Sequence, residues 1–206
     1  VNFTHNKGPY GFYAFNQKRM NKFENVIERL PEIRFDWKNA PFFSERLYYE
    51  SNTSLVNLNQ KFSRSPTDEH VFRADSFHEW TFPMKWREFK LTPSANFRET
   101  IYSRDKDESD AFARTAFGGA VDLRTHFYRV FNQSWDVWGI EANQLRHVFE
   151  PSVRYESILH SSVSNEELNK FDSVDSIDDS NRVTFGIENR IQTKRVVAGK
   201  MRRMTA

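Results

Sequence analysis

Long segments in which apolar and polar residues alternate are the feature that most constrains how this chain can fold. In residues 182–188, Val183, Phe185 and Ile187 alternate with Thr184 and a glycine, and a charged residue flanks the segment at each end. The same alternation recurs in residues 55–62, 121–128 and 153–157. Because side chains on a β-strand point alternately to its two faces, period two predicts strands with one apolar face and one polar face.

Strands are therefore expected through most of the chain, and little of it favours helix. With loose ends, we expect them at residues 10–17, 24–37, 46–62, 70–82, 86–103, 111–130, 135–149, 151–160 and 181–196. Only residues 24–30 could also form a short helix. Strands of about 10 residues are long enough to cross a bilayer at a tilt, whereas strands of soluble proteins average about 5–6 residues.

Polar loops and prolines divide these strands. Residues 104–110 and 161–181 are rich in charged or small polar side chains and are predicted as loops. Short turns alternating with long polar loops are typical of outer-membrane barrels. Each proline inside a strand segment should end a strand, start one or interrupt a ladder.

The fold class predicted is all-β, an antiparallel transmembrane β-barrel of which this chain is a fragment with long meandering strands. Aromatic residues reach 16%, although charged residues make up 28% of the chain. A strand that meets lipid on one side and water on the other explains both values. No run approaches the roughly 20 apolar residues of a membrane helix, so a membrane-spanning chain of this kind must cross with strands.

The ends of the sequence lead to a related expectation. It opens on Val1 without an apolar leader, and its last residues do not form a strand that ends in an aromatic residue. We interpret residues 1–206 as a single partial barrel domain that lacks its closing strands. Such a piece should form an open, curved sheet in isolation, and the basic residues of its tail are expected to be solvated.

Few residues point to catalysis or to a metal. The chain has no cysteine, which excludes disulfides, zinc ribbons and thiol nucleophiles. His78, His126, His147 and His160 form no ligand pair with metal-binding spacing. We therefore predict no catalytic residue, no metal site and no cofactor. A net charge of +2 gives no indication of nucleic-acid binding.

Two weaker alternatives stay open. The acidic residues Asp172, Asp175, Asp178 and Asp179 could hold Ca²⁺, but they lack the glycine and glutamate of an EF-hand loop, so a solvated acidic loop is favoured. Acidic and aromatic residues could also form a glycosidase site with stacked sugar. The residues considered for that site are Glu45, Glu50, Glu79, Glu88, Trp80 and Trp86. The tryptophans fit an aromatic girdle at a membrane interface equally well.

Four segments together resemble the LptD family, also called organic solvent tolerance proteins. They are RLPEIRF at 29–35 with LYYES at 47–51, LTPSANFRET at 91–100, LRHVFEPSVRY at 145–155, and FDSVD at 171–175 with NRVTFGIENRIQTK at 181–194. The positions that carry the resemblance are Arg29, Leu30, Pro31, Thr92, Pro93, Arg146, His147, Glu150, Pro151, Asp172, Asp175, Asn181, Asn189 and Lys194. The segments occur in the family's order and cover the middle of its barrel.

The resemblance implies a function. Proteins of this family accept lipopolysaccharide (LPS) from a periplasmic bridge and release it into the outer leaflet of the outer membrane. The implied partners are LPS, a plug lipoprotein similar to LptE, outer-membrane lipid, and an LptA-like bridge that binds through an N-terminal periplasmic domain, which we expect to be absent from residues 1–206. The resemblance assigns no substrate-contacting or gate residue to this part of the barrel.

Two other functions are compatible with the alternation alone. Another outer-membrane barrel, such as a porin or a receptor, would show the same strands without the four family-like segments. A soluble all-β carbohydrate-binding module would use the polar strand face as its solvent side, and periodicity cannot separate that face from a barrel lumen.

Overall fold

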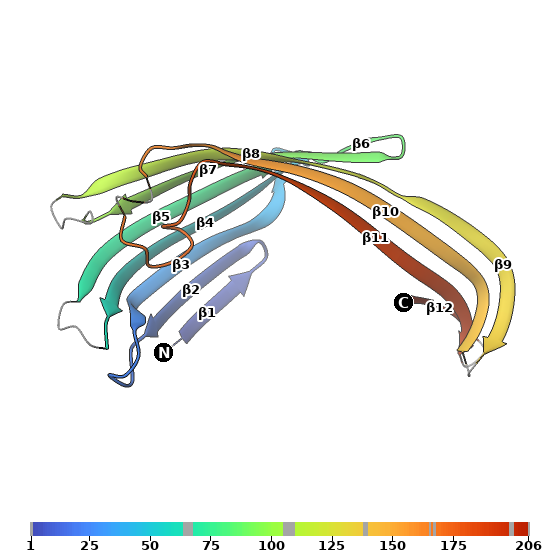
Figure 1. Cartoon of the computed structure of the whole chain (residues 1–206), viewed down its shortest axis with the longest axis horizontal. Coiled ribbons are helices and arrows are strands. Elements are labelled where there is room, and N and C mark those ends of the chain that lie inside the picture. The colour runs from blue at the N-terminus through green and yellow to red at the C-terminus, as the bar shows by residue number, and fades with distance from the viewer. Residues whose placement is uncertain are drawn as a thin grey trace. The chain divides into compact units, whose positions relative to one another are not determined.

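The computed structural model describes residues 2–63, 68–104, 110–137, 140–164, 166, 168–197 and 200–205. Twelve strands in these residues form one sheet (Figure 1). They are β1 (Asn2–Lys7), β2 (Tyr10–Gln17), β3 (Val26–Phe42), β4 (Ser44–Lys61), β5 (Glu69–Thr81), β6 (Met84–Trp86), β7 (Phe89–Tyr102), β8 (Phe112–Thr125), β9 (Phe127–Val137), β10 (Ile140–Ser161), β11 (Ser180–Val197) and β12 (Lys200–Thr205). Within the described residues, no helix is long and apolar enough to cross a membrane.

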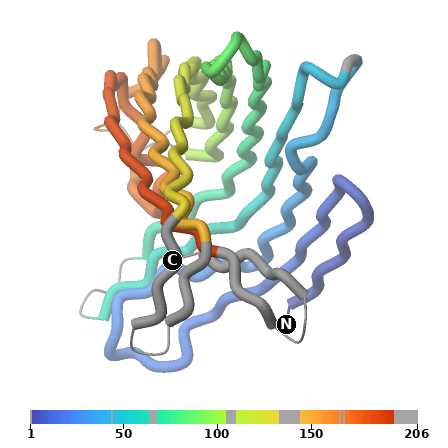
Figure 2. Tube along the Cα trace, turned by 90° about the vertical axis from the view of Figure 1, so that its right-hand side faces the viewer, coloured from blue at the N-terminus to red at the C-terminus, as the bar shows by residue number. Residues whose placement is uncertain are grey.

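The sheet is an antiparallel meander. Its order is β1-β2-β3-β4-β5-β7-β8-β10-β11-β12, while β6 pairs with β7 and β9 pairs with β10. Figure 2 shows the first part of this succession, from the dark blue of β1 to the teal of β5. In the described part of the chain, no ladder joins β1 to β12, so the sheet is not closed. The predicted all-β, antiparallel and open fold class is confirmed.

Several boundaries follow the sequence closely and others do not. The segment 10–17 coincides with β2, and the segment 24–30, which could also have been a short helix, is strand from Val26 onward as the start of β3. The expected strand 86–103 is a hairpin of β6 and β7, and 111–130 is divided at His126 into β8 and β9. The basic tail was expected to be a solvated terminus or loop, and the expectation of a loop was wrong: Lys200–Thr205 is β12, paired with β11. Backbone pairing in a hairpin overrides weak side-chain patterning there. The exposure of its side chains lies outside the described part of the chain.

Prolines lie where ladders change. At Pro31 the register between β3 and β4 shifts, and Pro93 of β7 lies between the residues paired with β6 and those paired with β5. Pro151 was expected to separate two strands, but β10 runs through it. It lies two residues beyond Phe149, the last described partner of β9. A residue without a backbone N–H is tolerated where a ladder shifts, as at Pro31, because the interrupted register requires no bond from it.

The chain divides into two compact units. Unit 1 comprises residues 1–82, 93–120 and 156–182, and unit 2 comprises residues 83–92, 121–155 and 183–206. Unit 1 contains the small apolar core, in which Leu168 and Phe171 of the β10–β11 loop pack on Val56, Leu58 and Val71 of β4 and β5. The loop therefore covers one face of these strands (Figure 1).

The sheet in unit 1 differs from that of a soluble protein because its covered face carries charged side chains beside the small apolar core, while its other face exposes apolar side chains. The buried side chains include Arg73, Asp75, Thr100 and Arg114. The exposed large apolar side chains on its strands include Ile33, Phe35, Leu55, Phe72, Ile101 and Phe117. A soluble sheet buries its apolar face, so this arrangement is the one expected where the outer face meets lipid.

Unit 2 shows the same segregation. Its exposed apolar side chains alternate along the strands with charged, polar or small ones, and they include Val121, Leu123, Val153, Tyr155, Val183, Phe185 and Ile187. Between them lie charged partners such as Asp122 with Arg124 and Glu150 with Arg190. The alternation predicted from sequence is thus realised as an apolar face and a charged face.

Candidate functional site

A row of aromatic side chains crosses the exposed face of unit 1. It runs over six neighbouring strands, β2, β3, β4, β5, β7 and β8. Successive ring centroids are 5.0–6.3 Å apart, and the rings are those of Tyr10, Trp37, Tyr49, His78, Phe97 and Phe117. Trp80 joins the row 5.5 Å from Tyr49. Aromatic girdles of this kind occur where a barrel meets the membrane–water interface.

The same geometry bears on the glycosidase alternative. The β4–β5 register brings Glu50 opposite Glu79, a pairing that the sequence did not predict. Trp80 follows Glu79 directly along β5 and therefore points to the opposite face. A sugar between the two carboxylates could not stack on this tryptophan. Trp86 stacks on Phe89, with centroids 6.3 Å apart, in the β6–β7 hairpin.

A buried ionic cluster fixes the β10–β11 loop to the strands of unit 1, and we call it the loop-anchoring cluster. Arg73 of β5 donates two parallel hydrogen bonds to Asp172, each 2.8 Å long, and a third of 2.8 Å to Asp175. Arg29 of β3 donates to Asp172 at 3.1 Å. Tyr102 of β7 donates its hydroxyl to Asp175 at 2.8 Å. Three strands thus hold two carboxylates of one loop.

The remaining oxygen of Asp175 organises the loop itself. It accepts hydrogen bonds from the backbone N–H groups of Phe171 and Asp172, at 2.9 and 3.1 Å. From β8, Arg114 donates to the carbonyl of Val174. The side chains of Arg73 and Asp175 are only 4% and 0% exposed. Buried charges are retained at such low exposure only when they are paired and hydrogen-bonded.

Charge within the cluster is balanced. The cations Arg29, Arg73 and Arg114 face the carboxylates of Asp172, Asp175 and Glu32, the last of which accepts from Arg29 at 2.9 Å. Burial by itself would raise the pKa of Asp172, but the hydrogen bonds and charge of Arg73 outweigh it, and the pKa of this loop carboxyl lies below its usual range. Asp172 is therefore ionised at neutral pH, and the cluster has no excess charge to attract an ion.

The acidic loop is thus used differently from a calcium site. Asp172 and Asp175 are engaged by arginines, and Asp179 accepts a hydrogen bond from the backbone N–H of Ser161 at 2.8 Å. In the described part of the chain, no group of three or more His, Asp or Glu side chains is placed to hold a metal ion. The interpretation of residues 172–179 as a simply solvated acidic loop was wrong for Asp175, which is buried.

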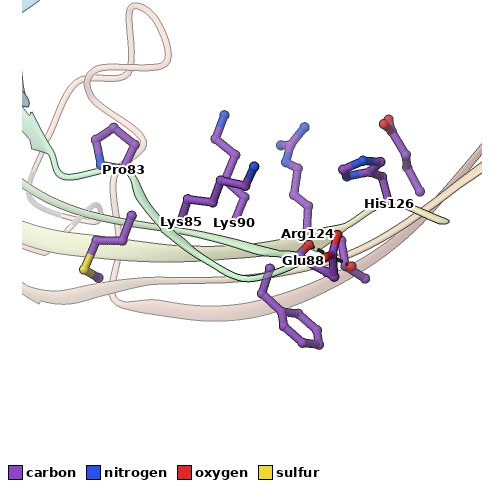
Figure 3. A pocket seen from close by; sticks show the side chains of 10 residues that line it. Pro83, Lys85, Glu88, Lys90, Arg124 and His126 are labelled. Carbon is purple, nitrogen blue, oxygen red and sulfur yellow. Dashed lines mark hydrogen bonds between the residues drawn. The ribbon is translucent and has the colours of Figure 1, made fainter.

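Unit 2 contains an open pocket, which we call the basic pocket. It has a volume of about 440 Å³ and lies among β6, the start of β7, the end of β8 and Glu150 of β10. The side chains of Lys85, Lys90, Arg124 and His126 point to the same side of the strands (Figure 3). Arg124 is paired with Asp122 through hydrogen bonds of 2.6 and 3.1 Å.

The residues that carry the family resemblance fall into three groups. Arg29, Asp172 and Asp175 meet in the loop-anchoring cluster, next to Leu30 and Pro31. A second group links β10 to the β11 side of the sheet. His147 contacts Asn189 at 3.2 Å, Glu150 pairs with Arg190 at 2.6 Å, and Ser157 donates to Asn181 at 2.7 Å.

The third group shares no contact within the described part of the structure. Thr92 and Pro93 lie on β7, Pro151 lies on β10, and Arg146 lies over the ring of Tyr128 at 4.5 Å. Lys194 belongs to β11, opposite Arg203, and its side chain is outside the described part. The sequence missed Arg73, Tyr102 and Arg114 of the cluster and both lysines of the pocket. These residues could have been suspected because they are polar or charged and lie within predicted strands. A charged side chain on a strand must either contact water or be paired with an opposite charge.

Comparison with known proteins agrees with this geometry. Residues 6–201 match the model of a protein family described as LPS transport system D. No curated protein matches the chain.

Proposed function

This chain belongs to the LptD family and has a role in LPS transport, and from that premise we propose that it forms part of an outer-membrane barrel that passes LPS from a periplasmic bridge to the outer leaflet. The polarity of the sheet is the observation that carries the proposal. Exposed apolar side chains occupy one face, and paired or clustered charges occupy the other. A barrel wall needs this arrangement, with lipid outside and water inside.

The charged face suits the sugar part of LPS. Arginine, glutamate, asparagine and tyrosine side chains on this face offer many hydrogen-bond donors and acceptors. A hydrated glycan could exchange water for such groups at little net cost, because protein–water and protein–sugar hydrogen bonds are similar in strength. The exposed apolar face and its aromatic row would meet the acyl chains and headgroups of the outer membrane.

We further propose that residues 1–206 belong to one barrel domain. β7, β8, β10 and β11 contribute residues to both compact units, which supports a continuous wall. The partners proposed are LPS, a plug lipoprotein similar to LptE and a periplasmic bridge similar to LptA. The family-like positions are proposed to be structural, since most of those with described contacts join neighbouring strands or fix the β10–β11 loop.

Depletion of the full-length protein from its host tests the transport role. Newly made LPS is followed with a reagent that reacts only at the cell surface. Loss of surface arrival, with LPS retained inside the envelope, is the expected result. Unchanged arrival would refute the transport role and leave a general outer-membrane barrel, such as a porin or a receptor, as the remaining explanation.

A further inference from the structure

We propose that the basic pocket of unit 2 binds a phosphate group of the LPS that the protein transports. This proposal rests on the proposed function and names the chemical group that one part of the wall recognises. Three features support it: the arrangement of two lysines, the pairing of the neighbouring charges, and the size of the pocket.

Lys85 and Lys90 lie directly opposite each other in the β6–β7 ladder. Side chains opposite one another in an antiparallel pair have Cβ atoms about 4.5–5.5 Å apart, so two like charges repel across it. The hairpin is tight, with Arg87 and Glu88 as its turn between Trp86 and Phe89. The two ammonium groups are therefore held on one face, and an anion placed between them would replace repulsion by two attractions.

The neighbouring carboxylates are paired mainly with other cations, although Asp122 also attracts Lys90 at longer range. Arg124 is paired with Asp122, and Glu150 is paired with Arg190. Lys85 and Lys90 take part in no ion pair within the described residues, and the one further carboxylate of the lining is that of Glu88, in the turn. The basic pocket thus differs from the loop-anchoring cluster, where cations and carboxylates are matched.

The shape of the pocket also fits. A volume of about 440 Å³ lies in the range of about 300–1,000 Å³ that small-molecule sites occupy, and it is large enough for a phosphorylated sugar. Lysine ammonium groups offer three donors each and bind phosphate as point charges. Phe89 directly precedes Lys90 along β7, and successive strand residues point to opposite faces. The two lysines therefore point away from the exposed Phe89 ring and onto the charged face, on which the proposed function places the glycan.

Direct binding to the full-length protein, purified in detergent in its native complex, tests the proposal. Three probes are used: LPS, the same LPS after chemical removal of its phosphates, and inorganic phosphate as a competitor. The K85Q/K90Q variant removes both charges and keeps side-chain length. The K18Q/K22Q variant removes the same charge from two exposed lysines outside the pocket and serves as the matched control.

Wild-type protein should bind intact LPS about tenfold or more tightly than dephosphorylated LPS, the loss expected when charge-assisted hydrogen bonds are removed. K85Q/K90Q should lose this preference and K18Q/K22Q should keep it. The preference should also fall as salt is raised. Because the substitution relieves repulsion, the variant should be at least as resistant to heat as wild type, which excludes misfolding as the cause.

Two results would overturn the proposal. A phosphate preference that persists in K85Q/K90Q would place recognition elsewhere. Equal binding of the two LPS forms, with inorganic phosphate bound at the pocket, would assign the site to free phosphate instead. Either result leaves surface arrival of LPS in the depletion experiment unaffected, so failure of the pocket and failure of the transport role are distinguishable.

Discussion

The two compact units differ in how the charged side chains on their polar faces are paired. In unit 1, Arg73, Asp172 and Asp175 are buried beneath a loop and satisfy one another. In unit 2, Lys85 and Lys90 face each other in an open pocket. A matched and buried cluster is costly to disturb and contributes to structure, whereas an unmatched and accessible pair is free to bind something else.

The same comparison separates charges that hold the fold together from charges that are available to a ligand. Loss of one partner in unit 1 leaves a buried charge without compensation. Loss of one partner in unit 2 removes a repulsion. Substitutions of equal size should therefore have effects of opposite sign on stability in the two units.

The largest effect is expected for Arg73→Ala. The substitution leaves Asp172 and Asp175 without the arginine that donates three hydrogen bonds to them, and breaking a buried pair in this way costs about 3–5 kcal/mol. Hydrogen exchange of the full-length protein should show that residues 168–177 lose protection. For comparison, Arg29→Ala removes a 27% exposed side chain that pairs with Asp172 and with the buried Glu32. It should cost less than Arg73→Ala, because the side chain of Arg73 is only 4% exposed and water can reach the site of Arg29 more easily. Equal protection in wild type and Arg73→Ala would show that the cluster does not hold the loop.

A smaller loss is expected for Tyr102→Phe. The substitution removes the hydroxyl that donates to Asp175 at 2.8 Å but keeps the ring, which stacks on Phe112 at 4.9 Å. A hydrogen bond to a charged group contributes about 1.5–3 kcal/mol. Urea unfolding in lipid vesicles should show this loss, and Tyr128→Phe, which alters an exposed ring in unit 2, should show almost none. A Tyr102→Phe variant as stable as wild type would mean that Asp175 finds another donor.

Local sequence pattern predicted much of the wall. The strands could be predicted from the alternation of apolar and polar residues, because this pattern is local and is visible in any window of several residues. β2 was predicted to its ends, and the β10–β11 loop was recognised by its small polar residues. The acidic residues of that loop were identified, but their partners were not, since Arg73 lies about a hundred positions away and only the strand order brings it near.

The basic pocket was not predicted because the turn of the β6–β7 hairpin was not predicted. Residues 86–103 were predicted as one strand because the turn residues Arg87 and Glu88 are neither glycine, proline, asparagine nor aspartate. Arg87 nevertheless adopts a φ of 52°, a conformation that non-glycine residues rarely take. Without that turn, no sequence argument could place Lys85 opposite Lys90. The register of a hairpin, unlike its alternation, depends on where the chain reverses.

A small gain in stability is expected for Lys90→Gln. Like charges directly opposite each other on neighbouring strands destabilise a sheet, and relief of the repulsion with Lys85 should contribute about 0.2–1 kcal/mol. Urea unfolding at low salt should show the gain, and high salt should reduce it because the repulsion is screened. Lys22→Gln, at an exposed loop position, should leave stability unchanged. A loss of stability in Lys90→Gln would indicate that the lysine is already paired with an anion inside the protein.

The smallest effect on the stability of the β10–β11 loop is expected from a change of pH near neutrality. The pKa of Asp172 lies below its ordinary value of 3.8 because Arg73 outweighs the effect of burial. A depressed folded-state pKa contributes stability above the unfolded pKa, and this stability is lost as pH falls through the folded value. Protection of residues 168–177 should therefore be constant from about pH 8 to pH 5 and decline only below 3.8.

In Arg73→Ala the same carboxyl keeps its burial and its contact with Arg29 but loses the hydrogen bonds and charge of Arg73, so its pKa should rise relative to wild type, because burial disfavours the charged form. Release of the loop should then begin at a higher pH in the variant than in wild type, a shift that simple loss of packing would not produce. Identical pH profiles for the two proteins would show that Arg73 does not set the charge of Asp172. The contrast between a matched cluster and an unmatched pocket would then have to rest on the lysines alone.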